Sequence, residues 1–270
     1  NVARVVHRLG GDCLALYPAG GVTGQSLQRL LDDEQVPNRC IDIAAETRES
    51  FSVHERNSGL DFRFVLPGPT LQEQEWRACL DAIQALPIAP RYLVASGSLP
   101  PGVPTDFYAQ LSAQAKALGC HVVLDTSGPA LAAALTEGVY LFKPSLRELR
   151  DLTGQALADE AQWCAAARQL IDQGRAQIVA LSLGEDGAVL VTADRAWRAP
   201  ALQVAVASTI GAGDSFLGGL VWALSQGQDL GESFRHGMAS GAAALLSSGT
   251  SLCHPQDVAR LHQQVVLRSL

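Results

Sequence analysis

From about residue 90 onward, two kinds of hydrophobic pattern alternate along the chain, one typical of β-strands and the other typical of amphipathic helices. Short runs rich in β-branched residues, namely YLVAS, HVVLD, VYLF and QIVALSL, alternate with amphipathic segments of helix length, including predicted helices over residues 105–118 and 129–137. Gly119, Gly138 and Gly174 each stand where a helix should end before the next strand. This alternation predicts an α/β fold in which right-handed crossovers join parallel strands and helices cover both faces of the sheet.

Polar and glycine-rich loops follow the predicted strands. SGSLPPG, DTSG, KPS and SLGEDG come directly after four of them. Binding sites in parallel sheets lie beyond the carboxyl ends of the strands. We therefore expect these loops to meet at one site.

Residues 49–68 break this rhythm, because polar and apolar residues alternate on either side of Asn57, Ser58 and Gly59. Such a pattern predicts a β-hairpin. A two-stranded ribbon is only marginally stable alone, so it must pack on another element. The candidates are a further N-terminal strand, the same ribbon of a second subunit, or both.

The first residues predict a helix, with Val2, Val5, Val6 and Leu9 on one face and Gly10 as its end. No capping residue precedes this pattern, so we expect the sequence to begin inside an element. The segment lacks the unbroken apolar core of a signal peptide.

Composition narrows the class of protein. The chain has 270 residues, of which 47% are apolar, enough for one sizeable domain with a small appendage. A net charge of −7 argues against a nucleic-acid partner. No apolar run approaches the roughly 20 residues that span a bilayer, so no membrane partner is expected. Six singly spaced cysteines predict free thiols in a cytoplasmic protein: Cys13, Cys40, Cys79, Cys120, Cys164 and Cys253.

The segment STIGAGDSFLGGL, residues 208–220, combines small residues with a carboxylate at the start of an apolar helix. The backbone N–H groups of Gly211, Ala212 and Gly213 can converge there with the positive end of the helix dipole, which predicts an anion hole. Asp214 would repel an anion but could accept a proton from a hydroxyl that attacks it. The alternative is that Asp214 only caps the helix.

Four motifs in this order resemble those of the PfkB (ribokinase-like) carbohydrate kinase family: SGSLPPGVP, KPSLREL, SLGEDGA and STIGAGDSFLGGL. Together with ETRESFSVHE and FVLPGP, they are most similar to the branch that acts on sugar phosphates. The resemblance implies a three-layer ribokinase-like fold with a mostly parallel sheet flanked by helices and a small β-hairpin lid. The implied core is residues 1–45 and 69–270, and the implied lid, also a dimerisation hairpin, is residues 46–68.

The resemblance also implies catalytic and substrate-binding roles. Asp214 corresponds to the catalytic base, and the anion hole beside it corresponds to Gly211, Ala212 and Gly213. The residues implied to contact the sugar phosphate are Asn1, Arg48 and Ser98.

Further positions match nucleotide and cation contacts of the family. Those implied to bind ATP are Lys143, Ser145, Ser182, Gly184 and Gly187. Glu148 corresponds to the glutamate that positions Mg²⁺. Those at which relatives bind a monovalent cation such as K⁺ are Ser208, Ile210, Ala244, Ser247, Gly249 and Ser251.

Several of these residues have plain structural interpretations. Glu148 lies in the first turn of a predicted helix, where a carboxylate is favourable without any metal. Gly184 and Gly187 frame GEDG, which would also serve as a hairpin turn. Ser145 replaces the asparagine of the family motif, and this shorter hydroxyl loses two amide donors.

The implied activity is ATP-dependent phosphorylation of fructose 6-phosphate at its 1-hydroxyl. Kinases for tagatose 6-phosphate or fructose 1-phosphate are the alternatives within the family. A different class, a catalytically weak sensor of nucleotide or sugar phosphate, also fits, because family members carry a further N-terminal segment with sugar-binding residues. We expect a homodimer through the hairpin, since Phe51, Val53, Phe62 and Phe64 need cover.

Overall fold

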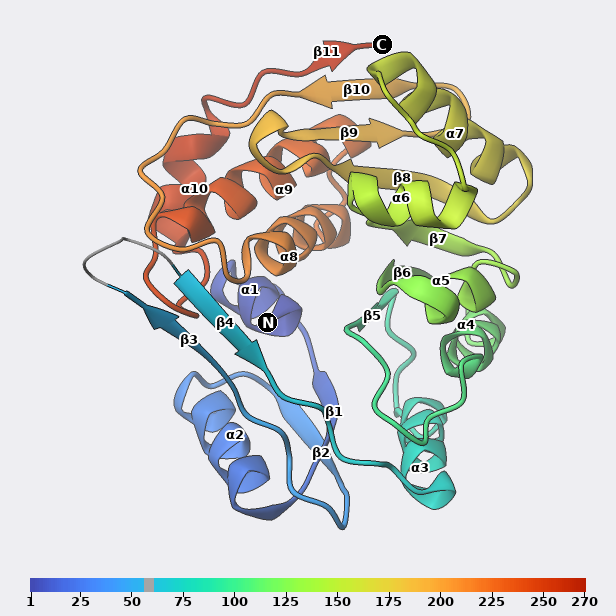
Figure 1. The fold of residues 1–270 in the computed structure, drawn as a ribbon, viewed down its shortest axis with the longest axis vertical. Helices are drawn as coiled ribbons and strands as arrows, with labels where there is room; N and C mark the ends of the chain where they lie inside the picture. Colours follow the sequence, from blue (N-terminus) through green and yellow to red (C-terminus); the bar gives the residue numbers. More distant parts are fainter. Residues whose placement is uncertain (56–60) are drawn as a thin grey trace. The chain divides into compact units, whose positions relative to one another are not determined.

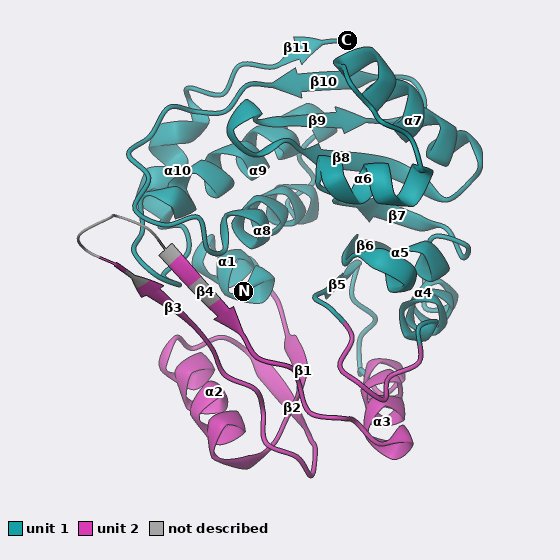
Figure 2. Ribbon diagram, viewed as in Figure 1, with its two compact units in different colours: residues 1–12, 86–98, 105–270 teal, residues 13–85, 99–104 magenta. Residues whose placement is uncertain are grey.

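The chain forms two compact units (Figure 2) in a computed structural model that describes residues 1–55 and 61–270. The large unit comprises residues 1–12, 86–98 and 105–270. The small unit comprises residues 13–85 and 99–104. The core and lid boundaries expected from the sequence stay a prediction.

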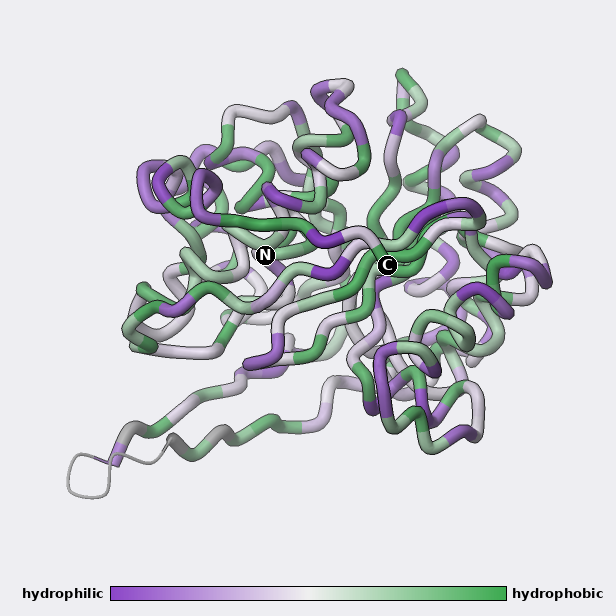
Figure 3. The backbone as a smooth tube through the Cα atoms, turned by 90° about the horizontal axis from the view of Figure 1, so that it is seen from above, coloured by the Kyte–Doolittle hydropathy of each residue, from purple (hydrophilic) through white to green (hydrophobic). Residues whose placement is uncertain are grey.

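A seven-stranded sheet forms the centre of the large unit, in the order β11-β10-β9-β8-β7-β6-β5. Four neighbouring strands are parallel, as predicted: β5 (Tyr92–Ser96), β6 (His121–Asp125), β7 (Val139–Phe142) and β8 (Ala176–Ser182). Their carboxyl ends therefore lie at one edge, where the polar loops begin. Leu124, Leu141 and Phe142 of these strands are fully buried. Figure 3 shows hydrophobic and hydrophilic stretches alternating along the backbone.

The other strands of this sheet run antiparallel to their neighbours. They are β9 (Ala188–Val191), β10 (Ala196–Ala199) and β11 (Arg268–Ser269). The 3₁₀ turn η1 (Gly184–Asp186) connects β8 directly to β9, and so short a connection allows only an antiparallel pair. The sheet is therefore mixed.

Helices cover both faces of this sheet, which gives three layers (Figure 1). One face carries α4 (Phe107–Ala117), α5 (Gly128–Ala134), α6 (Leu146–Thr153) and α7 (Glu160–Asp172). The opposite face carries α1 (Val2–Arg8), α8 (Ala212–Ser225), α9 (Leu230–Leu245) and α10 (Pro255–His262). The predicted helix over 129–137 ends earlier, because residues 135–137 continue as turns whose N–H groups bond to carbonyls three or four residues back.

Helix α1 packs closely on α8 because a glycine removes the side chain at their contact. A Cβ atom placed on Gly218 would lie 2.6 Å from the Cβ of Val5. Val2, Val5 and Val6 are buried, as the helical pattern predicted, whereas Leu9 caps the end of the helix. The expectation that no capping residue precedes the helix was wrong, because Asn1 occupies the N-cap position. This docking brings Asn1 to the first turn of α8.

The small unit contains two separate pairs of strands. The parallel pair is β1 (Ala15–Ala19) and β2 (Asn38–Asp42), which contacts α2 (Gly21–Asp33) and α3 (Glu73–Gln84). The antiparallel pair is β3 (Ser50–His54) and β4 (Asp61–Val65), with Ser50 opposite Val65. This ribbon confirms the predicted hairpin strands, while the predicted turn at 57–59 lies outside the described residues.

Two expectations from composition can be compared with the fold. All six cysteines are free thiols. No helix in the described part of the chain is long and apolar enough to cross a membrane.

Candidate active site

The first turn of α8 holds the carboxylate that the sequence singled out. Gly211 occupies the N-cap position with φ of 76°, a left-handed conformation that favours glycine. Asp214 lies inside the helix, in its first turn. Because Gly211 is the N-cap residue, Asp214 is not the cap, although a carboxylate in the first turn still interacts favourably with the helix dipole. Ala212 N donates to Thr209 O at 3.4 Å, whereas the N–H groups of Gly213 and Asp214 have no intrahelical acceptor and can point to an anion.

Asn1 fixes one side of the Asp214 carboxylate. Its amide Nδ2 donates to Asp214 Oδ2 at 2.7 Å, and its own Oδ1 accepts a hydrogen bond from the Arg4 guanidinium at 3.1 Å. The amide restrains the carboxylate through Oδ2 and leaves Oδ1 able to accept a proton. This contact joins residues 213 positions apart in the chain. The implied contact of Asn1 with a sugar phosphate stays a prediction.

A buried ion pair lies beside this turn. Lys143 follows β7 and Asp125 ends β6, two neighbouring parallel strands, and Lys143 Nζ lies 3.0 Å from Asp125 Oδ1. The side chains are only 8% and 19% exposed, respectively. A Cβ atom placed on Gly213 would lie 3.6 Å from Lys143 Nζ. The ammonium group is therefore part of the predicted anion hole as well as a partner for Asp125.

Asp125 is a site residue that the sequence analysis did not assign. Burial raises the pKa of its carboxyl group, Lys143 lowers it in part, and the negative charges of Asp214 and Glu148 raise it further. Three carboxylates and one ammonium group thus interact at the carboxyl edge of the sheet. The available signal was its position as the last residue of a predicted strand, immediately before the polar loop DTSG.

This carboxylate cluster has the oxygen donors of a divalent-cation site, but the ligand atoms of its three members do not all lie within 4.8 Å of one another, so water or phosphate oxygens would have to complete the coordination. Carboxylate oxygens are the ligands that Mg²⁺ prefers, and Mg²⁺ at such sites is commonly shared with substrate phosphates and water. The excess negative charge of Asp125, Glu148 and Asp214 over Lys143 is unfavourable in a half-buried site, and a cation would reduce it.

Ser145 and Glu148 form a capping box at the start of α6. Ser145 N donates to Glu148 Oε2 at 2.7 Å, and Glu148 N donates to Ser145 Oγ at 3.2 Å. Both side chains therefore have the helix-starting role that was the plain interpretation. Glu148 Oε1 and the Ser145 hydroxyl proton are not used by this box, so the capping role is compatible with metal or nucleotide contact.

The turn after β8 has its own structural requirement. Ser182 N and Oγ both donate to Pro144 O, at 2.9 and 3.2 Å, which joins this turn to the Lys143 loop. Gly187 has φ of 96°, and a Cβ atom there would lie 2.2 Å from Ala199 O. Only glycine fits this position, so the hairpin-turn interpretation of Gly187 is correct.

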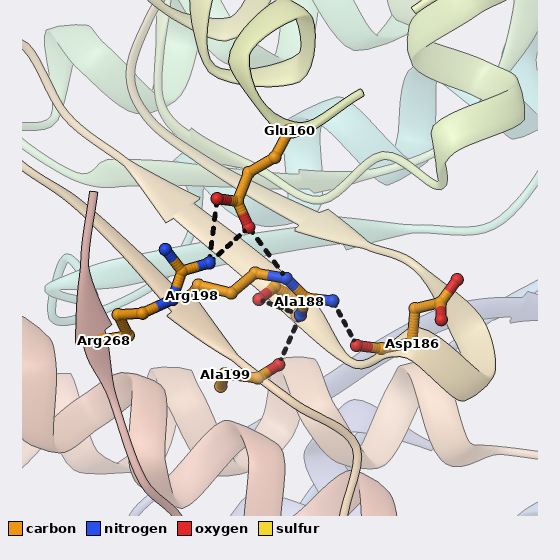
Figure 4. A network of polar contacts seen from close by, with 6 residues as sticks. All are labelled: Glu160, Asp186, Ala188, Arg198, Ala199 and Arg268. Carbon is orange, nitrogen blue, oxygen red and sulfur yellow. Dashed lines mark hydrogen bonds and ion pairs between the residues drawn. The ribbon is translucent and has the colours of Figure 1, made fainter. Parts of the chain in front are cut away.

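Arg198 on β10 braces the same turn (Figure 4). Its guanidinium donates to Asp186 O at 2.5 Å, Ala199 O at 2.6 Å and Ala188 O at 3.2 Å. Its Nε lies 3.4 Å from Glu160 Oε2, and Glu160 also accepts hydrogen bonds from Arg268 at 2.8 and 2.9 Å. This network fixes the loop that carries Gly184 and Gly187.

The structure brings the candidate monovalent-cation residues into neighbouring loops. Ser208 Oγ donates to Gly249 O at 3.2 Å and accepts from Ile210 N at 3.2 Å. Ser247 N donates to Ala244 O at 3.1 Å, and the Ser251 carbonyl accepts from the Arg8 guanidinium. Protein donors therefore already bond to three of the carbonyls that would face a cation, those of Ala244, Gly249 and Ser251.

The two remaining candidate residues lie in different units. Ser98 is exposed in the large unit, directly after Gly97, whose carbonyl accepts from the Tyr108 hydroxyl at 2.9 Å and whose N–H donates to Asp125 O at 2.9 Å. Arg48 belongs to the small unit, where it donates to Leu66 O at 3.3 Å.

Comparison with known proteins decides the family. Residues 1–257 match the model of the pfkB family carbohydrate kinases. The chain belongs to this family. It is 45% identical over 263 residues to ATP-dependent 6-phosphofructokinase isozyme 2 of Mycobacterium tuberculosis, covering 97% of this chain and 77% of that protein. It is 36% identical to a 1-phosphofructokinase of Xanthomonas campestris, covering 83% of this chain and 71% of that protein.

Solved structures agree with this assignment. A crystal structure of phosphofructokinase-2 from Escherichia coli in complex with potassium superposes with a TM-score of 0.93 at 38% identity, covering 97% of this chain and 85% of that one. The ribokinase-like fold and the carbohydrate kinase activity expected from the motifs are thus confirmed. An ATP-dependent kinase of this family uses ATP together with a metal ion.

Proposed function

We propose that this pfkB family kinase is an ATP-dependent 6-phosphofructokinase that uses MgATP to phosphorylate the 1-hydroxyl of fructose 6-phosphate. The observation that carries the proposal is the arrangement around the first turn of α8. There Asp214, held by Asn1, lies in the turn whose backbone N–H groups and neighbouring Lys143 can bind a phosphoryl group. The names of the relatives at 45% and 38% identity support the choice of sugar phosphate.

The proposed reaction is a direct phosphoryl transfer. Asp214 Oδ1 accepts the proton of the sugar hydroxyl as the new O–P bond forms, and the bond between the γ-phosphorus and the bridging oxygen breaks to release ADP. The N–H groups at the start of α8 and the Lys143 ammonium stabilise the negative charge on the phosphoryl oxygens. Hydrogen bonding to Asn1 keeps Oδ2 occupied, so the proton is directed to the other oxygen.

The proposed metal-binding residues are the carboxylates of Asp125 and Glu148. Mg²⁺ bound there would neutralise charge on the nucleotide phosphates. We further propose that Ser182, Gly184 and Gly187 line the nucleotide, because the turn that carries them is joined to the Lys143 loop. Arg48 and Ser98 are proposed contacts of the sugar phosphate.

The proposed assembly is a homodimer through the ribbon β3–β4. Phe51, Val53, Phe62 and Phe64 are each about half exposed, and the rings of Phe51 and Phe64 stack at 5.0 Å. An apolar ribbon of this kind favours a partner surface. Sedimentation that shows only monomer at micromolar concentration would contradict it.

The test of the catalytic proposal is Asp214→Asn, compared with Asp257→Asn in the first turn of α10. We expect Asp214→Asn to lower turnover by at least about 10²-fold, the lower end of what a positioned base contributes, while ATP binding and the fold are retained. Asp257→Asn should leave the rate unchanged. A purified Asp214→Asn protein that keeps most of its rate would refute the role of the base.

The substrate is tested separately on the wild-type protein. ADP release is measured with fructose 6-phosphate, fructose 1-phosphate, tagatose 6-phosphate and tagatose 1-phosphate at equal concentrations. We expect the highest kcat/KM with fructose 6-phosphate. A preference for fructose 1-phosphate would support the activity named for the relative at 36% identity. Binding without ADP release from any of the four would support the sensor instead.

A further inference from the structure

A cluster of two histidines and a glutamate lies apart from the proposed active-site residues. Glu232 and His236 stand four residues apart on α9, so they share one face of that helix, and His262 ends α10, which packs against α9 (Figure 1). The ligand atoms of these three residues all lie within 4.8 Å of one another. We propose that Glu232, His236 and His262 bind a divalent transition-metal ion, with Zn²⁺ as the best match, and that this ion links α9 to α10.

The distances are close to those of a zinc site. Glu232 Oε1 lies 2.6 Å from His262 Nε2 and 3.9 Å from His236 Nε2. Bond lengths of about 2.0–2.2 Å in a tetrahedral site place neighbouring ligand atoms about 3.3–3.6 Å apart. Side-chain rotations that move these atoms by less than about 1 Å would therefore seat the ion, and water would fill the fourth position.

The histidines carry buried nitrogens that need a partner. The contact between Glu232 and His262 lacks hydrogen-bond geometry, so His262 Nε2 is buried without a hydrogen-bond partner in the described part of the chain, as is His236 Nδ1. An unsatisfied buried polar atom costs about 1–3 kcal/mol in general. A metal ion on His262 Nε2 would satisfy that atom.

The surroundings of His236 favour a neutral ring with a free lone pair. The two imidazoles stack at 4.1 Å between ring centroids, and the rings of Trp222 and His236 form an edge-to-face contact with their centroids 4.9 Å apart. Burial lowers the pKa of His236, nearby His262 lowers it further, and Glu232 raises it in part. Neutral imidazole is the form that binds zinc.

One neighbouring cation competes for the carboxylate but leaves an oxygen free. Arg235 Nε lies 3.6 Å from Glu232 Oε2, and its guanidinium also donates to Val265 O. Glu232 Oε1, the oxygen that faces both histidines, is not part of that ion pair. The side chains of Glu232, His236 and His262 are 33%, 18% and 23% exposed, so an ion can enter from solvent.

The experiment begins with the wild-type chain. Zn²⁺ binding is measured by titration against a chromophoric chelator, and Co²⁺ is the spectroscopic probe, because its visible spectrum reports tetrahedral geometry and thiolate ligands add a strong near-ultraviolet band. We expect one equivalent of metal, a tetrahedral spectrum without that band, and a higher Tm in the presence of Zn²⁺. Absence of saturable binding, or a thiolate spectrum, overturns the proposal without any variant.

Three variants assign the ligands. His236→Gln and His262→Gln should each lose at least about tenfold in Zn²⁺ affinity and the Zn²⁺-dependent increase in Tm. His254→Gln, an exposed residue just before α10, is the matched control and should bind like the wild type. Undiminished affinity in both ligand variants overturns the proposal.

A further variant and a kinase assay complete the experiment. Glu232→Gln changes the ligand atom with almost no change in side-chain shape. If a histidine variant does not fold, the Zn²⁺ affinity of Glu232→Gln tests the proposal in its place. Kinase activity in Mg²⁺ without Zn²⁺ should be unchanged in every folded variant, because none of these residues belongs to the proposed active site. The metal measurement does not depend on the identity of the sugar substrate.

Discussion

The buried ion pair between Lys143 and Asp125 should be strongly coupled in stability. Lys143 Nζ and Asp125 Oδ1 are 3.0 Å apart, and their side chains are 8% and 19% exposed. Removing one partner of a buried pair costs about 3–5 kcal/mol, because the other charge stays buried without compensation. We therefore expect Lys143→Met and Asp125→Asn each to lower the free energy of unfolding by roughly 3 kcal/mol or more.

The double variant should lose much less than the sum of the two single losses, because neither member of the pair is left buried without the other. A coupling energy of at least about 2 kcal/mol is expected from a urea-unfolding cycle followed by tryptophan fluorescence. The control cycle uses Arg260 and Asp257, which are 2.7 Å apart but 55% and 32% exposed, and should give about 0.2–1 kcal/mol. All three variants of the buried pair should lack kinase activity.

The pH dependence of Lys143→Met adds a second measurement with a definite sign. The pKa of Asp125 is already above its ordinary value in the folded protein, and loss of Lys143 raises it further. A carboxyl group whose pKa is higher in the folded than in the unfolded protein binds more protons in the folded state. The free energy of unfolding therefore falls as the pH rises from the pKa of the unfolded state to that of the folded state. Lys143→Met should thus be more destabilised at pH 8 than at pH 5. Additive single losses, or no such pH difference, would refute the reasoning.

Two further predictions concern residues that support the site. Ser145→Ala removes the N-cap of α6 and should lower the free energy of unfolding by about 1 kcal/mol, whereas Ser145→Asn keeps a capping side chain and should lose little; urea unfolding measures both. Burial, and then the charge of Asp125, raises the pKa of Tyr108 to about 12, so its contribution to stability should be lost as pH rises from about 10 to 12. Tyr108→Phe should lose about 1 kcal/mol at pH 7 and show a smaller decline in Tm over that alkaline range; an equal decline in both proteins would contradict the pKa shift.

Local patterns in the sequence predicted much of the fold. The β-branched runs and amphipathic segments after residue 90 correspond to β5–β8 and the helices between them, because these patterns depend on residues that are near one another in the chain. The antiparallel strands β10 and β11 were not predicted. The two residues of β11 carry no periodicity, and their pairing with β10 is a contact between distant segments.

Some features of the candidate site could likewise be predicted from neighbouring residues, and others depended on the tertiary structure. The motif around Asp214 could be recognised from consecutive residues, and so could the capping box of Ser145 and Glu148, since such signals span a single turn. Only the tertiary structure placed Gly211 rather than Asp214 at the N-cap, because that assignment depends on the backbone angle of Gly211.

Contacts between distant residues could be found only in the folded chain. Asn1 meets Asp214 because Gly218 lets α1 pack closely on α8, and Asp125 meets Lys143 because β6 and β7 are neighbours in register. His262 joins Glu232 and His236 through the packing of α10 on α9. The sequence by itself determined which chemical groups begin or end each element. Which of those groups touch was decided by the packing of helices and strands, since that packing sets distances between residues far apart in the chain.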